Sequence, residues 1–196
     1  TNDLPYILAQ SKCILFADDT NIFSSGKRLS DVKSIINNEL TAVNELIQSN
    51  KLSLKIAKTK YMIMTSSRKK INFDDCDIYF DGQPIERVTK TIFLGVVIDD
   101  TMSWKSHIDH ICNKVSKGIG ILHRARQLVY SHTLLLLYNT LIKPHFTYCI
   151  TAWGKSSKMY IDRVVVIQKK IIRIISHSEF RAHTLELFKK FKKLAS

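Results

Sequence analysis

The chain has little glycine or proline and no paired cysteine motif, and these absences exclude several classes of protein. Only 6 Gly and 3 Pro occur among 196 residues, which argues against a disordered or loop-rich scaffold. The four cysteines are widely scattered and form no Cys-x-x-Cys pair, so neither a zinc ribbon nor a disulfide framework is predicted. Such cysteine usage is typical of a reducing, intracellular compartment, nuclear or cytoplasmic.

Long hydrophobic runs and a leader sequence are also missing. No apolar run reaches the length needed to span a membrane, and no signal peptide is visible, so no membrane partner is expected. The sequence begins with Thr1-Asn2-Asp3 and not with Met, which suggests a piece of a longer protein. Apolar residues make up 45% of the chain, enough to bury a core.

Positive charge is plentiful but unevenly distributed. The net charge is +13; residues 1–100 hold 13 Lys/Arg and 13 Asp/Glu, whereas residues 101–196 hold 17 and 4. All of the excess therefore lies in the second half, which predicts a polyanionic partner, nucleic acid before a membrane surface. A solvated basic face is the plain alternative.

The first hundred residues predict strands around one long helix. A β-hairpin is expected from Lys12–Phe16 and Asn21–Ser24, with residues 17–20 at its tip. Ser30 as an N-cap, followed by apolar residues at three- and four-residue spacing, predicts a helix that ends near Asn50. Shorter apolar runs predict four further strands: Tyr61–Thr65, Ile78–Phe80, Pro84–Val88 and Phe93–Ile98. The second and third of these flank Asp81-Gly82 and are expected to form a hairpin.

After Asp100 the apolar spacing becomes helical throughout. Four helices are expected: one whose apolar face runs from Ile108 to Leu122, then Thr133–Ile142, Ile161–Ile175 and Thr184–Leu194. This change coincides with the jump in charge, so we place a boundary near Asp100. The sequence predicts an α+β fold, with a mixed domain over residues 1–100 and an all-α domain over residues 101–196.

Asp18 and Asp19 form the strongest candidate for chemistry. They follow an apolar strand at a tight turn, where the alternation of side chains is broken, so Asp18 can project into a site with Asp19 beside it. Carboxylate oxygens are preferred ligands of Mg²⁺, and two metals can activate a 3′-hydroxyl and stabilise a leaving pyrophosphate. The plain alternative is a solvated turn, because Asp74-Asp75 and Asp99-Asp100 repeat the dipeptide.

The sequence around this turn resembles a known family. Phe16-Ala17-Asp18-Asp19 with its flanks is similar to the catalytic turn of reverse transcriptases from non-LTR retrotransposons, especially jockey-like elements. Further blocks resemble the family in the same order: Asn2–Pro5, Leu52–Lys60, Phe93–Val96, Trp104, His107-Ile108, Leu135–Pro144, Tyr148, Trp153-Gly154, Gln168–Lys170 and Arg173–Ile175. Lys55 departs from the family, which usually has Asn there. The resemblance covers nearly the whole chain.

The resemblance implies an RNA-directed DNA polymerase, a nucleotidyltransferase that uses Mg²⁺ or Mn²⁺, an RNA template, a DNA primer and deoxynucleotides. The implied fold is part of a polymerase palm, an antiparallel sheet with a packed helix, followed by an all-α thumb. Asp18 would be the main metal ligand of the turn, assisted by Asp19. Lys58 would lie near the phosphates of the incoming nucleotide; a general-acid role for pyrophosphate and a structural role both stay open.

The resemblance also implies contacts with nucleic acid. Phe93, Leu94 and Gly95 would form a primer grip, and glycine suits close approach of the backbone to a ligand, although a simple strand glycine is the alternative. Basic residues of the thumb would neutralise phosphates, so binding should weaken steeply with salt. The expected contacts are Lys105, Lys114, Lys117, Arg124, Arg126, Lys169, Lys170 and Arg173.

One expected part has no counterpart in these residues. The family takes a further metal-binding aspartate from a strand far upstream of the turn, yet only 17 residues precede Asp18, and Asp3 is not that ligand. The fingers, the N-terminal half of the palm and the endonuclease of the parent protein are likewise not matched. We therefore expect these 196 residues alone not to polymerise. The rival interpretation is a non-catalytic nucleic-acid-binding remnant of a mobile element.

Two other candidate functional sites, a zinc site and a base-stacking site, have weaker support than the aspartate turn. His107, His110 and Cys112 lie close together, but zinc would need a fourth ligand and better spacing, so a place in a thumb helix is expected. Trp104 and Trp153 could stack on bases, although packing anchors near helix ends are the simpler interpretation.

Overall fold

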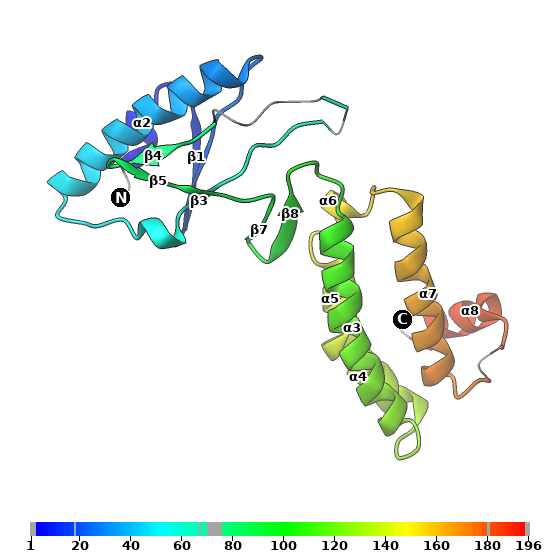
Figure 1. Cartoon of the computed structure of the whole chain (residues 1–196). Coiled ribbons are helices and arrows are strands. Elements are labelled where there is room, and N and C mark those ends of the chain that lie inside the picture. The colour runs from blue at the N-terminus through cyan, green and yellow to red at the C-terminus, as the bar shows by residue number, and fades with distance from the viewer. Residues whose placement is uncertain (1–2, 18, 67, 70–75, 180, 195–196) are drawn as a thin grey trace. The chain divides into compact units, whose positions relative to one another are not determined.

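The computed structural model describes residues 3–17, 19–66, 68–69, 76–179 and 181–194. The chain divides into two compact units, here called the N-terminal unit (Thr1–Thr89) and the C-terminal unit (Lys90–Ser196). Both are drawn in Figure 1. Helices and short strands are both present, which is an α+β composition. Each unit has its own hydrophobic cluster.

The N-terminal unit combines one long helix with short strands. Its elements are α1 (Leu4–Ile7), β1 (Lys12–Phe16), β2 (Asp19–Phe23), α2 (Leu29–Ser49), the 3-10 helix η1 (Ile56–Lys58), β3 (Lys60–Tyr61), β4 (Tyr79–Phe80), β5 (Gln83–Pro84) and β6 (Glu86–Arg87). β1 pairs with β2 and β4 with β5, both antiparallel, whereas β3 and β6 are parallel. Among the described residues these pairs stay separate, so the single antiparallel sheet that we expected is not what forms here.

Helix α2 forms where its apolar spacing predicts, but its start differs. Arg28 is the N-cap residue and makes no side-chain cap bond. Ser30 lies inside the helix, and its hydroxyl donates to Asp31 Oδ1 at 3.2 Å. The predicted Ser30 cap is therefore wrong. The acidic Asp31 still lies in the first turn, where it favours the helix dipole and pairs with Arg28 Nε at 3.0 Å.

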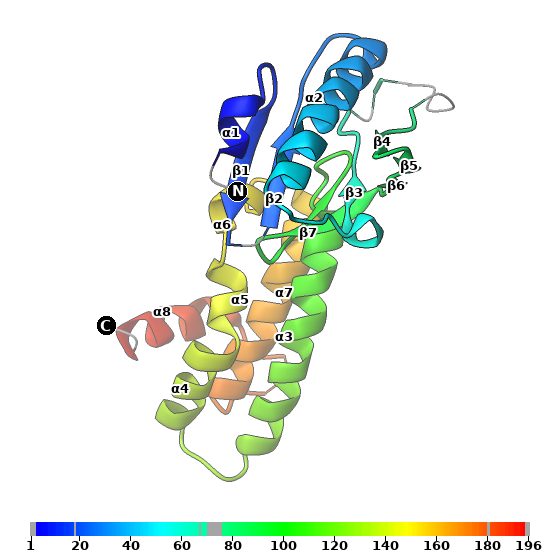
Figure 2. The same cartoon turned by 90° about the vertical axis from the view of Figure 1, so that its left-hand side faces the viewer.

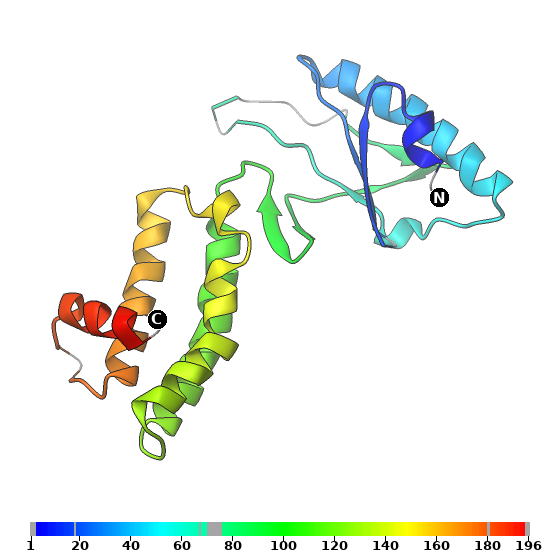
Figure 3. The ribbon, with the colours of Figure 1, turned by 180° about the vertical axis from the view of Figure 1, so that it is seen from behind.

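A small apolar cluster holds the N-terminal unit together. Its buried members come from α1, α2 and the β4–β5 region: Leu4, Leu8, Val43, Phe80 and Ile85. α2 lies against α1 and β4, as Figure 3 shows for the dark blue and light blue helices. Cys13, Leu15 and Ile22 of the β1–β2 hairpin pack at the edge of the cluster. The face of the hairpin that carries these three side chains therefore attaches it to the rest of the unit.

The C-terminal unit is a hairpin followed by helices. Its elements are β7 (Lys90–Phe93), β8 (Val96–Asp99), α3 (Lys105–Ala125), α4 (Ser131–Leu141), α5 (Lys143–Thr147), α6 (Ile150–Trp153), α7 (Lys158–Ile175) and α8 (Thr184–Leu194). The four predicted helices are confirmed within three residues at each end. α5 and α6 were not predicted, because the short segment around Pro144 and Cys149 shows no sustained helical period.

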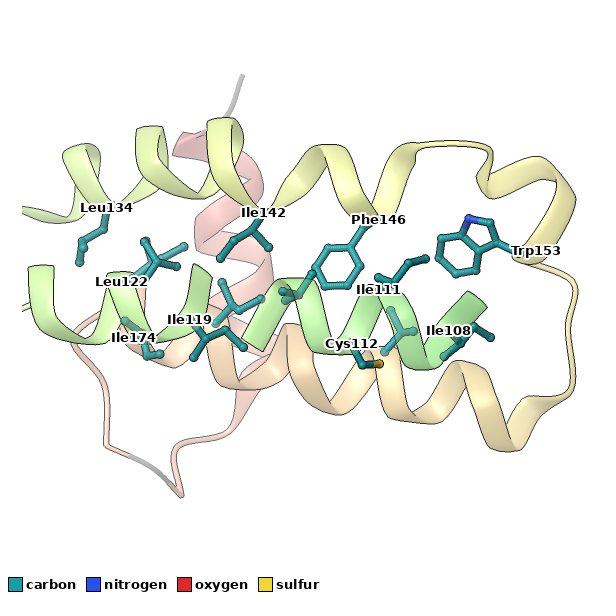
Figure 4. Close-up of a cluster of buried hydrophobic side chains, with 14 residues drawn as sticks. Ile108, Ile111, Cys112, Ile119, Leu122, Leu134, Ile142, Phe146, Trp153 and Ile174 are labelled. Carbon is teal, nitrogen blue, oxygen red and sulfur yellow. The ribbon is translucent and has the colours of Figure 1, made fainter. Parts of the chain in front are cut away.

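A continuous core runs along this unit. α3 lies beside α7 and packs on α4 and α5 (Figure 2), and α8 lies against α7. Buried side chains from all the helices except α8 meet in one cluster (Figure 4): Ile108, Ile111, Cys112, Val115, Ile119, Leu122, Leu134, Ile142, Phe146, Trp153, Val164, Ile171, Ile174 and Ile175. Gly118 lets α3 approach Ile142, since a Cβ there would lie 2.7 Å from Ile142 Cγ1.

Three strand predictions are wrong. The predicted strand Pro84–Val88 divides into β5, which pairs with β4, and β6, which pairs with β3. Phe93–Ile98 is not one strand but the inner part of the β7–β8 hairpin, with Leu94 and Gly95 as its turn. Both turn residues have positive φ, which a continuous strand does not allow. The Tyr61–Thr65 strand is reduced to Lys60–Tyr61. Apolar runs of this length do not distinguish a strand from the two arms of a tight hairpin.

Candidate active site and nucleic-acid surface

The β1–β2 hairpin carries the aspartate turn. Phe16 pairs with Asp19 across the strands, so the hairpin closes tightly between these two residues. Ala17 has φ of 52°, the left-handed conformation that such tight turns require. Asp18, the predicted main metal ligand, lies outside the described residues. The sequence predicted Asp19 at the tip of the hairpin, but in the structure Asp19 is the first residue of β2.

Asp19 lies on the exposed face of this hairpin. It faces Phe16 across the strands, and Ile14 is on the same side; all three are exposed. Leu15 and Cys13 point to the other side and pack on the apolar cluster. The carboxylate of Asp19 is thus an accessible hard oxygen donor beside a tight turn, and such a donor suits Mg²⁺ or Mn²⁺.

The strand that leads to this turn is held by a buried carboxylate of α2. Glu39 is only 8% exposed, and its Oε1 accepts the backbone N–H groups of Gln10 at 2.8 Å and Ser11 at 3.1 Å. Burial alone would raise the pKa of Glu39, but the hydrogen bonds from Ser11 and Gln10 outweigh it and hold that pKa below its usual value. Glu39 therefore fixes the start of β1 against α2.

Lys58, the candidate near the nucleotide phosphates, ends the 3-10 helix η1. Its backbone N–H donates to Lys55 O at 2.9 Å, and the residue is exposed. The turn thus brings the backbone of the divergent Lys55 next to that of Lys58. The exposed ammonium group of Lys58 is accessible to an anion.

The predicted primer-grip residues form a tight turn in the C-terminal unit. Phe93 pairs with Val96, and the two residues between them have φ of 45° at Leu94 and 79° at Gly95. Two successive positive φ angles are those of a type I′ hairpin turn. Left-handed backbone costs a residue with a side chain about 1–2 kcal/mol, so Leu94 is strained and its surroundings must hold it.

Tyr148, between α5 and α6, contacts this turn. Its hydroxyl donates to the carbonyl of Leu94 at 2.6 Å, and its ring lies beside Gly95. The carbonyl of Tyr148 accepts the indole N–H of Trp153 at 2.9 Å. The buried Trp153 thereby connects the hairpin turn to the helical core.

His107 connects the hairpin to α3. Its Nδ1 accepts the backbone N–H of Val97 at 3.2 Å, so the neutral ring carries its proton on Nε2. The ring is packed edge-on to Trp104 and Trp153, with centroids 6.3 and 5.9 Å away. Burial lowers the pKa of His107, and the neighbouring His110 lowers it further. His107 and both tryptophans therefore act as packing groups here.

Asp99 organises the junction between β8 and α3. Its carboxylate, 8% exposed, accepts hydrogen bonds from the backbone N–H and hydroxyl groups of Thr101 and Ser103 and from the N–H of Trp104, at 2.7–3.3 Å. Burial alone would raise the pKa of Asp99, but these hydrogen bonds more than offset it and lower that pKa. They hold Met102 and Trp104 at positive φ and so set the direction of α3.

Several predicted phosphate contacts share one face of α3. Lys114, Lys117 and Arg124 are exposed, and their spacing puts them on the side away from the buried face. Acidic side chains are absent from the sequence between Asp109 and Asp162, and Asp109 is paired with Arg163 of α7. The surface of α3 is therefore basic with little neutralisation.

The other predicted contacts differ in their surroundings. Lys105 begins α3, and Lys169 and Lys170 are exposed on α7. Arg126 and Arg173 are engaged within the fold: Arg126 donates to Ser178 O at 3.2 Å, and Arg173 to Ala182 O at 3.1 Å. They hold the segment between α7 and α8.

The sequence did not indicate the supporting roles of Tyr148, Asp99 and Glu39, although Tyr148 matches one of the family blocks. Only Asp99 had a readable signal, because Asp followed by Thr and Ser at alternate positions before a helix is typical of side-chain capping. Within the described ranges, the structure contains neither a cluster of three or more His, Cys, Asp or Glu that could bind a metal nor a helix able to cross a membrane.

Three curated relatives are similar to the chain. "Probable RNA-directed DNA polymerase from transposon X-element" of Drosophila melanogaster is 22% identical over 200 residues, covering 98% of this chain and 22% of the relative. "RNA-directed DNA polymerase from mobile element jockey" of Drosophila funebris is 19% identical over 186 residues, covering 92% and 20%. "Retrovirus-related Pol polyprotein from type-1 retrotransposable element R1 2" of Nasonia vitripennis is 27% identical over 157 residues, covering 76% and 37%.

These relatives confirm the resemblance to reverse transcriptases of non-LTR retrotransposons. The chain spans between a fifth and two fifths of their length. No family model matches the chain, and no solved structure matches it.

Proposed function

Because the chain is related to reverse transcriptases of non-LTR retrotransposons, we propose that it is part of an RNA-directed DNA polymerase. It would supply the aspartate turn and part of the palm in the N-terminal unit, and the primer grip and thumb in the C-terminal unit. The observation that carries the proposal is the β1–β2 hairpin, whose register pairs Phe16 with Asp19 beside a tight turn, together with the other blocks of the sequence, which occur in the order of the family.

The metal would be held by Asp18 and Asp19. Asp19 suits this role because its carboxylate is exposed beside the turn. Bound Mg²⁺ or Mn²⁺ would supply activation of the primer 3′-hydroxyl and stabilisation of the leaving pyrophosphate. Lys58 would offer its exposed ammonium group to the nucleotide phosphates, and Glu39 would orient β1 so that the turn keeps its shape.

The C-terminal unit would hold the RNA template and DNA primer. Lys114, Lys117 and Arg124 would neutralise phosphates from one face of α3, with Lys169 and Lys170 of α7 as further contacts. Arg126 and Arg173 would contribute less, because their guanidinium groups already hold backbone carbonyls. Phosphate neutralisation releases counterions, so affinity should fall steeply with salt.

Binding of an RNA–DNA hybrid tests this role. Fluorescence anisotropy of a labelled hybrid, titrated with the chain at several salt concentrations, should give a steep negative slope of log K against log salt. Replacing Lys114, Lys117 and Arg124 with Ala should weaken binding and reduce that slope by about 1 for each phosphate that is no longer neutralised.

The control removes the same charge from the N-terminal unit, with Lys27, Lys51 and Arg68 replaced by Ala. This variant should keep the salt slope of the wild type. Salt-independent binding, no binding at low salt, or equal effects of the two triple variants would contradict the proposed role of the C-terminal unit.

The two-metal site is proposed to need a further carboxylate beyond these 196 residues. Primer extension with Mg²⁺ on an RNA template should therefore give no product with this chain alone, whereas clear DNA synthesis would refute that part of the proposal. The rival, a non-catalytic nucleic-acid-binding remnant, shares the hybrid binding and differs in having no metal at the aspartate turn. Metal binding at that turn therefore distinguishes the two.

A further inference from the structure

We propose that Tyr148 is a positioning residue that holds the Leu94-Gly95 turn in the conformation in which it would meet the end of a primer. The proposal rests on the proposed function, since it takes Phe93, Leu94 and Gly95 as the primer grip. It adds a residue outside that segment, contributed by the link between two helices.

The turn requires outside support. Leu94 carries a side chain and yet has φ of 45°, followed by Gly95 at 79°. A residue held in this sparsely populated region persists only where neighbouring groups determine its conformation. β7 and β8 pair for only four residues each, so the hairpin alone gives the turn little support.

Tyr148 provides that support at both turn residues. Its hydroxyl donates a 2.6 Å hydrogen bond to the carbonyl of Leu94. Its Cε1 lies 3.5 Å from the position that a Cβ on Gly95 would occupy. The carbonyl of a left-handed residue is thus fixed by the hydroxyl, and the flat ring covers the following glycine.

Tyr148 is itself held in place by a hydrogen bond from a core residue. Its carbonyl accepts the indole N–H of Trp153, and Trp153 is 2% exposed within the main apolar cluster. On the other side of the hairpin, Val97 donates to His107, whose ring also packs against Trp153. Besides the Asp99 junction, the hydrogen bonds of Tyr148 and His107 therefore attach the hairpin to the helices, and the turn would contact a primer as one body with the surface of α3.

The exposure of Tyr148 points to positioning more than to core stability. The residue is 51% exposed and is not a member of the buried core cluster, and its hydroxyl is bonded to the carbonyl of a strained residue. Removing the hydroxyl should therefore change the turn far more than it changes the fold.

The first arm of the test measures the turn directly. In Tyr148→Phe, amide hydrogen exchange of Val96, whose pairing with Phe93 closes the turn, should accelerate roughly tenfold in NMR spectra, the equivalent of one hydrogen bond. Exchange in the middle of α3 should be unchanged. Tyr130→Phe is the matched control, because it removes a hydroxyl from an exposed tyrosine at the N-cap of α4.

The second arm measures the primer end. An RNA–DNA hybrid carries 2-aminopurine either at the primer 3′ terminus or in the duplex interior. Tyr148→Phe should lose most of the fluorescence change at the terminus while the interior signal and the dissociation constant stay close to wild type. Adding Leu94→Gly to Tyr148→Phe should slow the exchange of Val96 again, because glycine adopts the left-handed turn without help.

The possible results distinguish failure of the positioning role of Tyr148 from failure of the proposed function. Unchanged exchange in Tyr148→Phe, or loss of overall affinity in step with the terminal signal, overturns the positioning role. Exchange of Val96 that the added Leu94→Gly does not slow again also counts against it. If the wild-type chain does not bind the hybrid at all, the proposed function fails, and the exchange arm still decides whether Tyr148 holds the turn.

Discussion

The two units differ in how chemistry and stability are divided between them. The N-terminal unit carries the aspartate turn, yet it has few buried residues, and its hairpin exposes Ile14, Phe16 and Phe23 on one face. Neither proposed metal ligand, Asp18 or Asp19, belongs to the C-terminal unit, which has a long continuous core and most of the positive charge. The proposed catalytic group thus lies on a lightly packed element, and the proposed nucleic-acid surface lies on a rigid one.

Each unit also has its own spectroscopic probes. Both tryptophans and all seven histidines of the sequence lie in the C-terminal unit. Tryptophan fluorescence therefore reports the unfolding of that unit alone, whereas circular dichroism reports both. The predictions below use this difference.

The largest effect is expected in the C-terminal core. Leu122 is fully buried on α3, so Leu122→Ala should lower the free energy of unfolding of the C-terminal unit by about 2–5 kcal/mol. Leu128→Ala, at a residue that is 84% exposed, should stay within about 0.5 kcal/mol of wild type. Urea unfolding followed by tryptophan fluorescence measures both. Similar losses in the two variants would contradict the assigned core.

A smaller effect is expected at the junction that directs α3. Asp99→Ala should cost about 1–3 kcal/mol in the same assay, because it leaves the N–H groups of Thr101, Ser103 and Trp104 without their acceptor. Asp100→Ala removes the neighbouring carboxylate as the matched control. If the two substitutions cost the same, the capping role of Asp99 is refuted.

In the N-terminal unit we expect Glu39→Gln to cost about 1 kcal/mol, since an amide oxygen accepts the N–H groups of Gln10 and Ser11 less strongly than a carboxylate. Glu45→Gln, exposed on the same helix, is the control. Circular dichroism should show the loss, and the tryptophan transition should stay in place. A shift of the tryptophan transition would show that the two units do not unfold separately.

The smallest effect concerns pH. The pKa of His107 is lowered in the folded chain by burial and by His110, so the unfolded chain binds the proton more readily. Stability is therefore full above the unfolded pKa of about 6.5 and falls as pH drops from there toward the folded pKa, by at most about 1.4 kcal/mol per pH unit. His110, whose pKa is also lowered, acts in the same direction.

His107→Gln should reduce this pH dependence in the tryptophan assay. The N-terminal unit contains no histidine and should keep its stability between pH 7 and about 6. An unchanged slope in His107→Gln would mean that His107 is not protonated on unfolding in this range.

The helices were the most predictable part of the fold, and the tight turns the least. The apolar spacing from Ile108 to Leu122 repeats over many turns, so it identifies α3 and its buried face. Phe93–Ile98 reads as one apolar strand because the side chains of the turn, Leu94 and Gly95, carry no polar signal. That turn depends on Tyr148, which is 54 residues away from Leu94 and cannot be paired with it from one sequence.

The residues of the candidate site could be predicted from the sequence, but the side chains that hold the site in place could not. The family resemblance selected Asp19 and the hairpin around it, and the pairing of β1 with β2 is confirmed. The role of Glu39 could not be read, because an acidic residue within an amphipathic helix is usually solvent-exposed. Only the fold brings it to the backbone of Gln10.

Metal binding at the aspartate turn tests the central claim most directly. In a ¹⁵N-labelled chain, submillimolar Mn²⁺ should broaden the amide signals of Ala17, Asp19 and Thr20 before those of any other segment. Excess Mg²⁺ should compete with Mn²⁺, and Asp18→Asn with Asp19→Asn should abolish the broadening. Uniform broadening, or the same pattern in the double variant, would contradict a polymerase metal site and leave the chain a nucleic-acid-binding remnant.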